Sequence, residues 1–268
     1  MDVVFLAEPL AAEDIRKYFS GSISEKHELR WDERKECVVS RTVMMLGAIE
    51  FAEMPSVPTA PESLPVMIEA IRRMGPDSLP WTPGAASFRT RSEWLRKRGL
   101  VGEDWPDLDG SRLSATLEDW LSPYIHGMTK KSDLQRLDLL KILQSMYSFR
   151  QLREIDRLAP THLVVPTGSR IPVDYAAPDT PPVLAVRLQE MFGQTETPAV
   201  GGGTVPVLLH LLSPARRPLA VTQDLPSFWK NAYPEVRKDM RGQYPKHEWP
   251  EDPLHAEPTR RAKKRTGK

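Results

Sequence analysis

The spacing of apolar residues changes twice along the chain, and each change predicts a different kind of structure. Before residue 57, apolar and polar residues alternate loosely from Ile23 to Trp31, and a Val- and Thr-rich run follows from Cys37. A period of two, interrupted by the polar turn DERKE, predicts neighbouring antiparallel strands. A further strand is expected at Val3 to Leu6 and two helical turns at Ala12 to Phe19. Residues 1–56 are therefore predicted to be strand-rich.

From residue 57 to 158 the period becomes helical. Met67, Ile68 and Ile71 recur on one face, and Gly75 follows as a stop signal. The run SDLQRLDLLKILQSMYSF, which begins at Ser132, predicts one long amphipathic helix. These residues are expected to pack as a small helical bundle.

At residue 159 the pattern changes again, and residues 159–253 predict a compact α+β unit. THLVV and RIPVDY read as two strands around a PTGS turn, and the segments 205–212 and 218–221 read as a second pair around SPARRP. Between the pairs, Pro181 to Phe192 predicts a helix, with proline at its start and glycine after it. Two more helices are expected, one after an Asp224 cap and one from Tyr233. The order is of the ββαββα type, with helices packed on one antiparallel sheet.

The last segment, residues 254–268, carries six Lys and Arg and no apolar group large enough to fold around, so it predicts a disordered basic tail. The fold class expected for the whole chain is α+β: a strand-rich segment, a small helical bundle, the ββαββα-type unit and this tail.

Composition narrows the classes of function. The chain has 268 residues, of which 40% are hydrophobic and 27% charged, and a net charge of +1. Because the net charge is small, any affinity for nucleic acid must come from local patches. One cysteine excludes an internal disulfide and fits a reducing, cytoplasmic location. No apolar run is long enough for a membrane span and no signal peptide is recognisable, so no membrane partner is expected.

The segment from Thr222 to Pro253 is the strongest candidate for a site, because aromatic and cationic residues are interleaved in it. Such a mixture suits a surface that binds phosphates and stacks on bases. The candidate residues for contacts with phosphates and bases are Lys230, Arg237, Lys238, Arg241, Tyr244, Lys246 and Trp249. The other interpretation is structural: Phe228 and Trp229 form the buried face of a short helix, and the charges are simply solvated.

Several stretches resemble the C-terminal region of bacterial HrpB-type DEAH-box RNA helicases. They are LAPTHLVVPTGSRIPVDY (158–175), PPVLAVRLQEMFGQTETP (181–198), VPVLLHLLSPARRPLAVTQDL (205–225) and YPEVRKDMRGQYPKHEWPEDP (233–253), followed by PTRRAKKR. LPWTP (79–83) and ATLEDWLSPYI (115–125) resemble the same family, and the match is looser before Pro80. The resemblance implies that residues 1–56 are part of an OB-like domain, although they offer fewer than the five strands of a complete OB-fold.

The resemblance also implies where catalysis resides. Helicases of this family carry a phosphate loop and a DEAH tetrapeptide in two RecA-like domains, and this sequence contains neither motif. ATP and Mg²⁺ are therefore expected only in the helicase core of the parent protein, and this chain is predicted to be inactive alone. No residue is predicted to be catalytic, and the six histidines show no metal-ligand spacing.

Three functions stay open. The first is an accessory region of such a helicase that binds single-stranded RNA without sequence preference and contacts the RecA-like core. The second is a protein-interaction or scaffold module with no direct RNA contact. The third is a free-standing enzyme, such as a nuclease.

Overall fold

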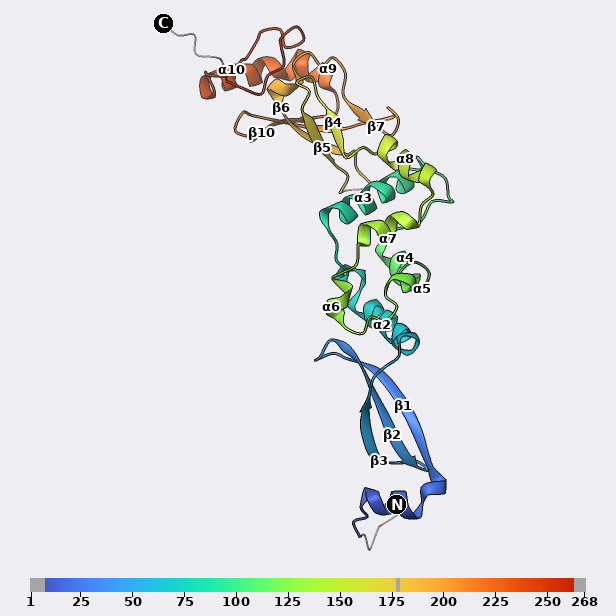
Figure 1. The fold of residues 1–268 in the computed structure, drawn as a ribbon. Coiled ribbons are helices and arrows are strands. Elements are labelled where there is room, and N and C mark those ends of the chain that lie inside the picture. The colour runs from blue at the N-terminus through green and yellow to red at the C-terminus, as the bar shows by residue number, and fades with distance from the viewer. Residues whose placement is uncertain (1–7, 177–178, 263–268) are drawn as a thin grey trace, which may run out of the picture. The chain divides into compact units, whose positions relative to one another are not determined.

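The computed structural model describes residues 8–176 and 179–262, so the strand predicted at Val3 to Leu6 lies outside the described residues. The described chain forms two compact units (Figure 1). The first holds the chain up to Trp81 and residues 110–142, and the second holds residues 82–109 and the chain from Leu143 onward. The predicted division into residues 1–56, 57–158, 159–253 and 254–268 stays a prediction.

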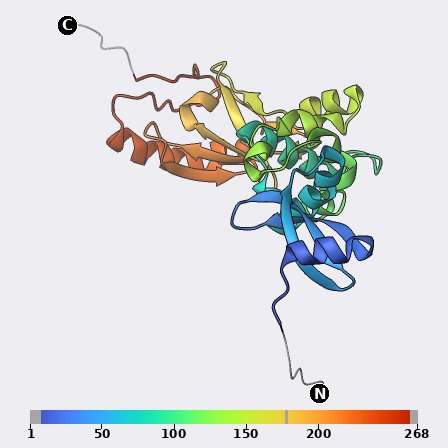
Figure 2. The ribbon, with the colours of Figure 1, turned by 60° about the horizontal axis from the view of Figure 1, so that its bottom comes forward.

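A three-stranded antiparallel meander makes up the strand-rich part of the first unit (Figure 2). Its strands, in the order β1-β2-β3, are β1 (Ile23–Asp32), β2 (Cys37–Leu46) and β3 (Ile49–Ser56). Trp31 lies opposite Val38 in the β1–β2 register, and both side chains are buried. The predicted meander is confirmed, as is the preceding helix α1 (Ala12–Tyr18). The OB-like assignment of these strands stays an expectation.

The helices of the first unit are short, apart from one. α2 (Ala60–Met74) begins at a capping box in which the Glu62 carboxylate accepts a hydrogen bond from the Thr59 backbone N–H at 2.9 Å. Its buried residues include Met67, Ile68 and Ile71, the predicted face. The other helical segments here are η1 (Ser20–Ser22), η2 (Pro76–Ser78), α4 (Gly110–Ala115), α5 (Leu117–Trp120), η3 (Ser122–Tyr124) and α6 (Lys131–Leu134).

The long helix expected from Ser132 is wrong, because local caps divide it. α6 ends at Leu134, α7 (Leu139–Ser145) contains the boundary between the two units, and α8 (Phe149–Leu158) is separate. The Asp138 carboxylate accepts from the Lys141 N–H at 3.2 Å, and Ser148 and Gln151 form a capping box ahead of α8. Each cap satisfies backbone donors that a continuous helix would have bonded internally.

The second unit is organised around a five-stranded sheet in the order β10-β9-β6-β5-β4 (Figure 1). Its strands are β4 (His162–Val164), β5 (Arg170–Asp174), β6 (Val183–Arg187), β9 (Leu208–Leu212) and β10 (Pro218–Thr222). Both predicted strand pairs are confirmed, β4 with β5 and β9 with β10. Leu184, Val186, Leu209 and Leu211 alternate with less buried neighbours, so the core of this unit lies on one face of the sheet.

The predicted helix at Pro181 to Phe192 is wrong. Residues 183–187 form β6, and only the 3₁₀ turn η4 (Leu188–Met191) that follows is helical. A short apolar run does not distinguish a strand from a buried helix by its period alone. The correction changes the topology, because β6 pairs with β9 in parallel, so the sheet is not wholly antiparallel.

Helices and aromatic side chains complete the second unit. α3 (Pro83–Lys97) packs against α8, and α9 (Leu225–Ser227), the π-helical turn η5 (Phe228–Ala232) and α10 (Tyr233–Gln243) follow the sheet. Asp224 caps α9 as predicted, its carboxylate accepting from the Ser227 N–H at 2.8 Å. Phe228 and Trp229 are buried with Phe192 and Tyr233 in an edge-to-face cluster, which confirms the structural interpretation of these two aromatic residues.

A tight hairpin of β7 (Ala199–Val200) and β8 (Val205–Pro206) is connected by the glycine-rich segment GGGT. Gly201, Gly202 and Gly203 all have positive φ angles, which suits glycine because it lacks a Cβ. A Cβ at Gly201 would also come within 3.1 Å of Leu100 and Thr204 side-chain atoms. The segment is therefore a structural turn.

The chain stays packed for several residues beyond Pro253. Residues 254–262 form no helix or strand, but the Thr259 N–H donates to the Gln189 carbonyl at 3.0 Å. The rest of the predicted basic tail lies outside the described residues. Within the described ranges, no helix is both long and apolar enough to cross a membrane, and no group of three or more His, Cys, Asp or Glu residues is placed to hold a metal ion.

Candidate nucleic-acid interface

The predicted RNA-binding residues lie on three successive segments, η5, α10 and the loop that follows. Lys230, Lys238, Arg241 and Lys246 are exposed, Arg237 and Tyr244 are half-buried, and Trp249 is buried. Among the described residues, no ion pair involves any of the four exposed cations. Their charges are therefore available to a partner.

Arg237 has a structural role in this fold. Its Nε donates to the Trp249 carbonyl at 3.0 Å and its Nη2 binds the Glu251 carboxylate at 2.8 Å. Its side chain is 20% exposed. The guanidinium thus holds α10 to the following loop. Arg241 lies on the same helix face, but its side chain is exposed and can contact a partner, whereas that of Arg237 is already bonded within the fold.

Trp249 differs from the expectation that its ring stays exposed. It is 6% exposed, and its indole N–H donates to the Tyr244 carbonyl at 3.0 Å. Tyr233, beneath the same loop, donates from its hydroxyl to the Pro250 carbonyl at 2.8 Å, and burial raises the pKa of this phenol. These aromatic residues therefore anchor the loop to α10 in place of forming a stacking surface.

The fold adds cations to this region that the sequence did not single out. Arg187 ends β6, next to Leu212 at the end of β9, and the turn that leads to β10 carries Arg216 and Arg217. The Tyr244 hydroxyl lies 3.5 Å from Ser213 Oγ, which brings the loop after α10 to the same turn. We call the four residues Arg187, Arg216, Arg217 and Lys246 the basic sheet end.

Two hydrogen bonds close the turn of the basic sheet end. The Ser213 N–H donates to the Arg217 carbonyl at 2.8 Å, and Ser213 Oγ accepts from the Arg217 N–H at 3.1 Å. Arg216 has φ +61°, a left-handed conformation that is uncommon for an arginine and leaves its side chain exposed. The available signal in the sequence was an arginine directly after VLAV and two more in SPARRP, but their proximity depends on the parallel pairing of β6 and β9.

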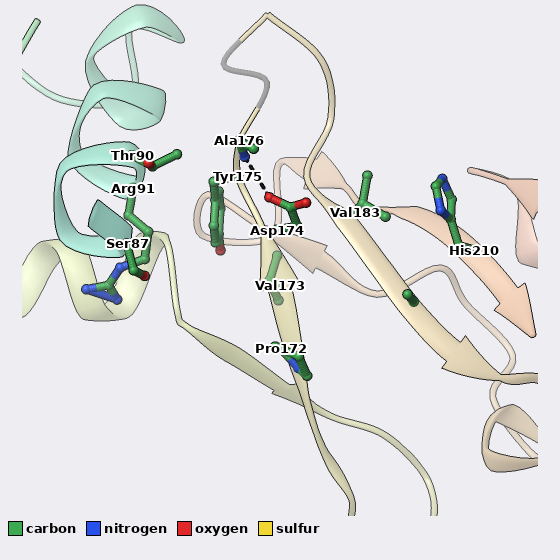
Figure 3. Close-up of a pocket in the computed structure, with 11 residues that line it drawn as sticks. Ser87, Thr90, Arg91, Pro172, Val173, Asp174, Tyr175, Ala176, Val183 and His210 are labelled. Carbon is green, nitrogen blue, oxygen red and sulfur yellow. Dashed lines mark hydrogen bonds between the residues drawn. The ribbon is translucent and has the colours of Figure 1, made fainter. Parts of the chain in front are cut away.

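A separate hollow of about 550 Å³ lies beside α3 on the sheet (Figure 3). Thr90 of α3, Asp174 of β5 and His210 of β9 line it. The Asp174 carboxylate accepts from the Ala176 N–H at 2.8 Å. Among the described residues, no hydrogen bond joins Asp174 to His210, so the hollow contains no paired acid and base.

Arg91 and Tyr175 close one side of this hollow and are structural. The Arg91 guanidinium binds the Asp156 carboxylate of α8 and the Ala159 carbonyl, each at 3.0 Å. Burial lowers the pKa of Arg91 and raises that of Tyr175. The basic sheet end and α10 are thus the stronger candidate, since their exposed cations, unlike Arg91 and Arg237, have no ion-pair partner in the described part of the chain.

The second unit is thus an α+β fold that combines a mixed five-stranded sheet with exposed cations at one end of it and on α10. Residues 120–253, half of the chain, match the family described as HrpB_C, ATP-dependent helicase C-terminal, and the chain belongs to this family. The family resemblance found in the sequence is confirmed.

Two further comparisons agree. The chain is 39% identical over 247 residues to the ATP-dependent RNA helicase HrpB of Escherichia coli (strain K12), covering 90% of this chain and 30% of that protein. It is similar to the crystal structure of the E. coli DExH-box NTPase HrpB, with a TM-score of 0.72 and 36% identity over 95% of this chain and 31% of the other. A crystal structure described as E. coli DEAH/RHA helicase HrpB gives a TM-score of 0.64, with 36% identity over 85% of this chain and 29% of the other. The chain therefore spans about three tenths of the length of these relatives.

Proposed function

We propose that this chain is the C-terminal accessory region of an ATP-dependent HrpB-type RNA helicase and that it binds single-stranded RNA without sequence preference. The observation that carries the proposal is the set of exposed cations on α10 and the basic sheet end that have no ion-pair partner among the described residues. Phosphate contacts of this kind position a strand and release counterions, but they read no sequence.

The partner in the same protein would be the RecA-like helicase core, which supplies ATP binding and hydrolysis. The accessory region would hold the strand near the motor and lengthen its stay there. The competing function is a scaffold that only braces the core. The contacts of Arg237 and Trp249 favour that alternative for the loop after α10, since both residues hold the loop to the helix.

Salt dependence separates the two functions. Binding of a mixed-sequence single-stranded RNA would be measured at several salt concentrations for the wild type and for Lys238→Ala/Arg241→Ala. Each lost phosphate contact should reduce the slope of log K against log salt by about 0.7, so the double variant should lose about 1.4. Arg237 is left intact because of its structural contacts.

The matched control removes two cations that are already paired. Arg136 and Lys141 are both strongly exposed and lie within 4.0 Å of Asp133 and 3.0 Å of Asp138, respectively. Arg136→Ala/Lys141→Ala should leave the salt slope unchanged. If the wild type shows no salt-dependent binding, or if both double variants bind like the wild type, the scaffold function is favoured.

A further inference from the structure

Arg187 occupies a distinctive position at the edge of the sheet. It is the last residue of β6, and β6 and β9 run in parallel, so both strands end at the same edge. Open sheets with parallel strands place their ligands beyond the carboxyl ends of those strands. The loop after α10 reaches this edge, where the Gln189 side-chain amide donates to the Glu248 carbonyl at 3.0 Å.

Arg187 is half-buried, and one donor of its guanidinium is buried without an acceptor. Its Nε is inaccessible to solvent and has no hydrogen-bond partner among the described residues, and no ion pair involves its side chain there. A guanidinium is a planar group with five N–H donors that stays charged. Leaving such a donor without an acceptor and without water costs free energy. An acceptor with negative charge is the partner that this geometry suits best.

His247 adds a second donor at the same place. It directly precedes Glu248, whose carbonyl binds the side chain of Gln189 two residues after Arg187, and burial together with the positive charge of Arg187 lowers the pKa of His247. Its ring packs edge-on against Tyr244, with 6.2 Å between the ring centres. A neutral imidazole still offers one N–H, and an anion between it and Arg187 would favour its protonated form.

The surrounding charge favours an anion over a cation. Arg216, Arg217 and Lys246 are exposed at the same edge and give it a positive potential. The acidic residue next in the chain, Glu248, is exposed and lines a different hollow, together with Phe192 and Pro250. Arg187 therefore does not depend on that carboxylate for compensation.

We propose that Arg187 and His247 form a binding site for one phosphate group at the carboxyl edge of the β6–β9 pair. The ligand class is a phosphate ester, and under the proposed function, on which this inference rests for the source of the ligand, it is a backbone phosphate of single-stranded RNA. The site differs from the diffuse attraction of α10, because the Arg187 Nε is shielded from solvent whereas the α10 cations Lys238 and Arg241 are exposed.

Imidazole resonances of the full chain, labelled with ¹⁵N and ¹³C at histidine, provide the test. Inorganic phosphate would be titrated at constant ionic strength and pH against chloride. The His247 signals should shift and saturate in the millimolar range or below, and Arg187→Gln should remove the saturable shift. Arg136→Gln, which removes an exposed cation outside the basic sheet end, should retain it. A shift that is linear in phosphate, equal in chloride, or unchanged by Arg187→Gln would overturn the inference.

A second arm distinguishes the source of the phosphate. A single-stranded RNA oligonucleotide without terminal phosphates and a 5′-phosphorylated mononucleotide would each replace inorganic phosphate. Both should shift the His247 signals. Arg187→Gln should lower the affinity for the oligonucleotide about ten-fold, as expected for the loss of one hydrogen-bonded contact to a charged group. If RNA binds but the His247 signals do not shift, this site is overturned and the proposed function is not. If phosphate and the mononucleotide bind saturably but RNA does not bind, the site exists and its assignment to RNA is overturned.

A folding control accompanies both arms. If Arg187→Gln loses its circular dichroism or dispersed spectrum, Arg187→Lys replaces it. Lysine keeps the charge but lacks the planar set of N–H donors, so the affinity for phosphate should fall at least several-fold. An unchanged affinity in a folded Arg187→Lys variant would mean that charge alone attracts phosphate, which overturns a directed site.

Discussion

At the scale of single residues, adjacent cations on α10 have different roles. Arg237 binds the Trp249 carbonyl and the Glu251 carboxylate, and Lys238, its neighbour, is exposed. Helical geometry alone would place Arg237 with Arg241 on a common surface. The loop that folds back over α10 uses Arg237 and leaves Lys238 and Arg241 available.

This difference predicts opposite effects on stability. Arg237→Ala should lower the free energy of unfolding by about 1–2 kcal/mol, because the buried Trp249 carbonyl loses its donor. The Glu251 pair should contribute little, since that carboxylate is 86% exposed. Lys238→Ala should stay within about 0.5 kcal/mol of the wild type. Urea unfolding of both variants measures this, and equal stability of the two would contradict the role given to Arg237.

His247 predicts a pH dependence of stability. Its pKa in the folded chain is below the ordinary value of 6.5, so the unfolded chain binds more protons near that pH. Stability linked to this group should therefore be complete above about pH 6.5 and decrease as the pH falls below it. His247→Gln should flatten the change in unfolding free energy between pH 8 and pH 5. A variant with the same pH profile as the wild type would show that His247 does not contribute.

At the scale of elements, local signals predicted most of the structure, and the errors have specific causes. The strands β4 and β5 surround a turn with proline and glycine, so their ends are marked in the sequence. β6 has no such marker: VLAVR between Pro182 and Gly193 fits either a strand or a helix. Its identity is decided by pairing with β9, which is distant in the sequence. The three arginines of the basic sheet end were missed for the same reason, because Arg187 meets the β9–β10 turn only through that pairing.

The strand assignment of β6 can be tested at Ala185, an exposed position between the buried Leu184 and Val186. Ala185→Thr should raise stability or leave it unchanged, because a β-branched residue suits the open face of a strand, on a scale that spans about 1 kcal/mol. In a helix the same change should cost about 0.6 kcal/mol. Ala185→Gly is the matched control and should be destabilising in either case. Thermal unfolding of the three proteins decides between the assignments.

At the scale of the whole molecule, the compact units of the structure differ from the segments predicted from the sequence. The sequence separates strand-rich, helical and α+β segments at residues 56 and 158. By contacts, α2 and α4 to α6 belong with the meander, and α3 and α8 belong with the five-stranded sheet. A boundary predicted from the sequence lies where the spacing of apolar residues changes along the chain. A compact unit, in contrast, can contain segments that are distant in the sequence.

If the two compact units unfold separately, substitutions in their cores should act separately. Met67→Ala in the first unit and Leu184→Ala in the second each remove a fully buried side chain and should cost about 2–5 kcal/mol. In calorimetry each variant should lower one transition and leave the other in place. A single transition that both variants shift together would show one cooperative unit.

The parallel pairing of β6 with β9 has a consequence for protein synthesis. β6 can pair with β5 as soon as both leave the ribosome, but its other edge stays open until residues 208–212 have been made. An open strand edge in an unfinished chain is a template for wrong pairing and a site for chaperone capture. Slow translation between residues 187 and 212 should therefore lower the yield of correctly folded protein more than slow translation within the β4–β5 hairpin, whose partners emerge together.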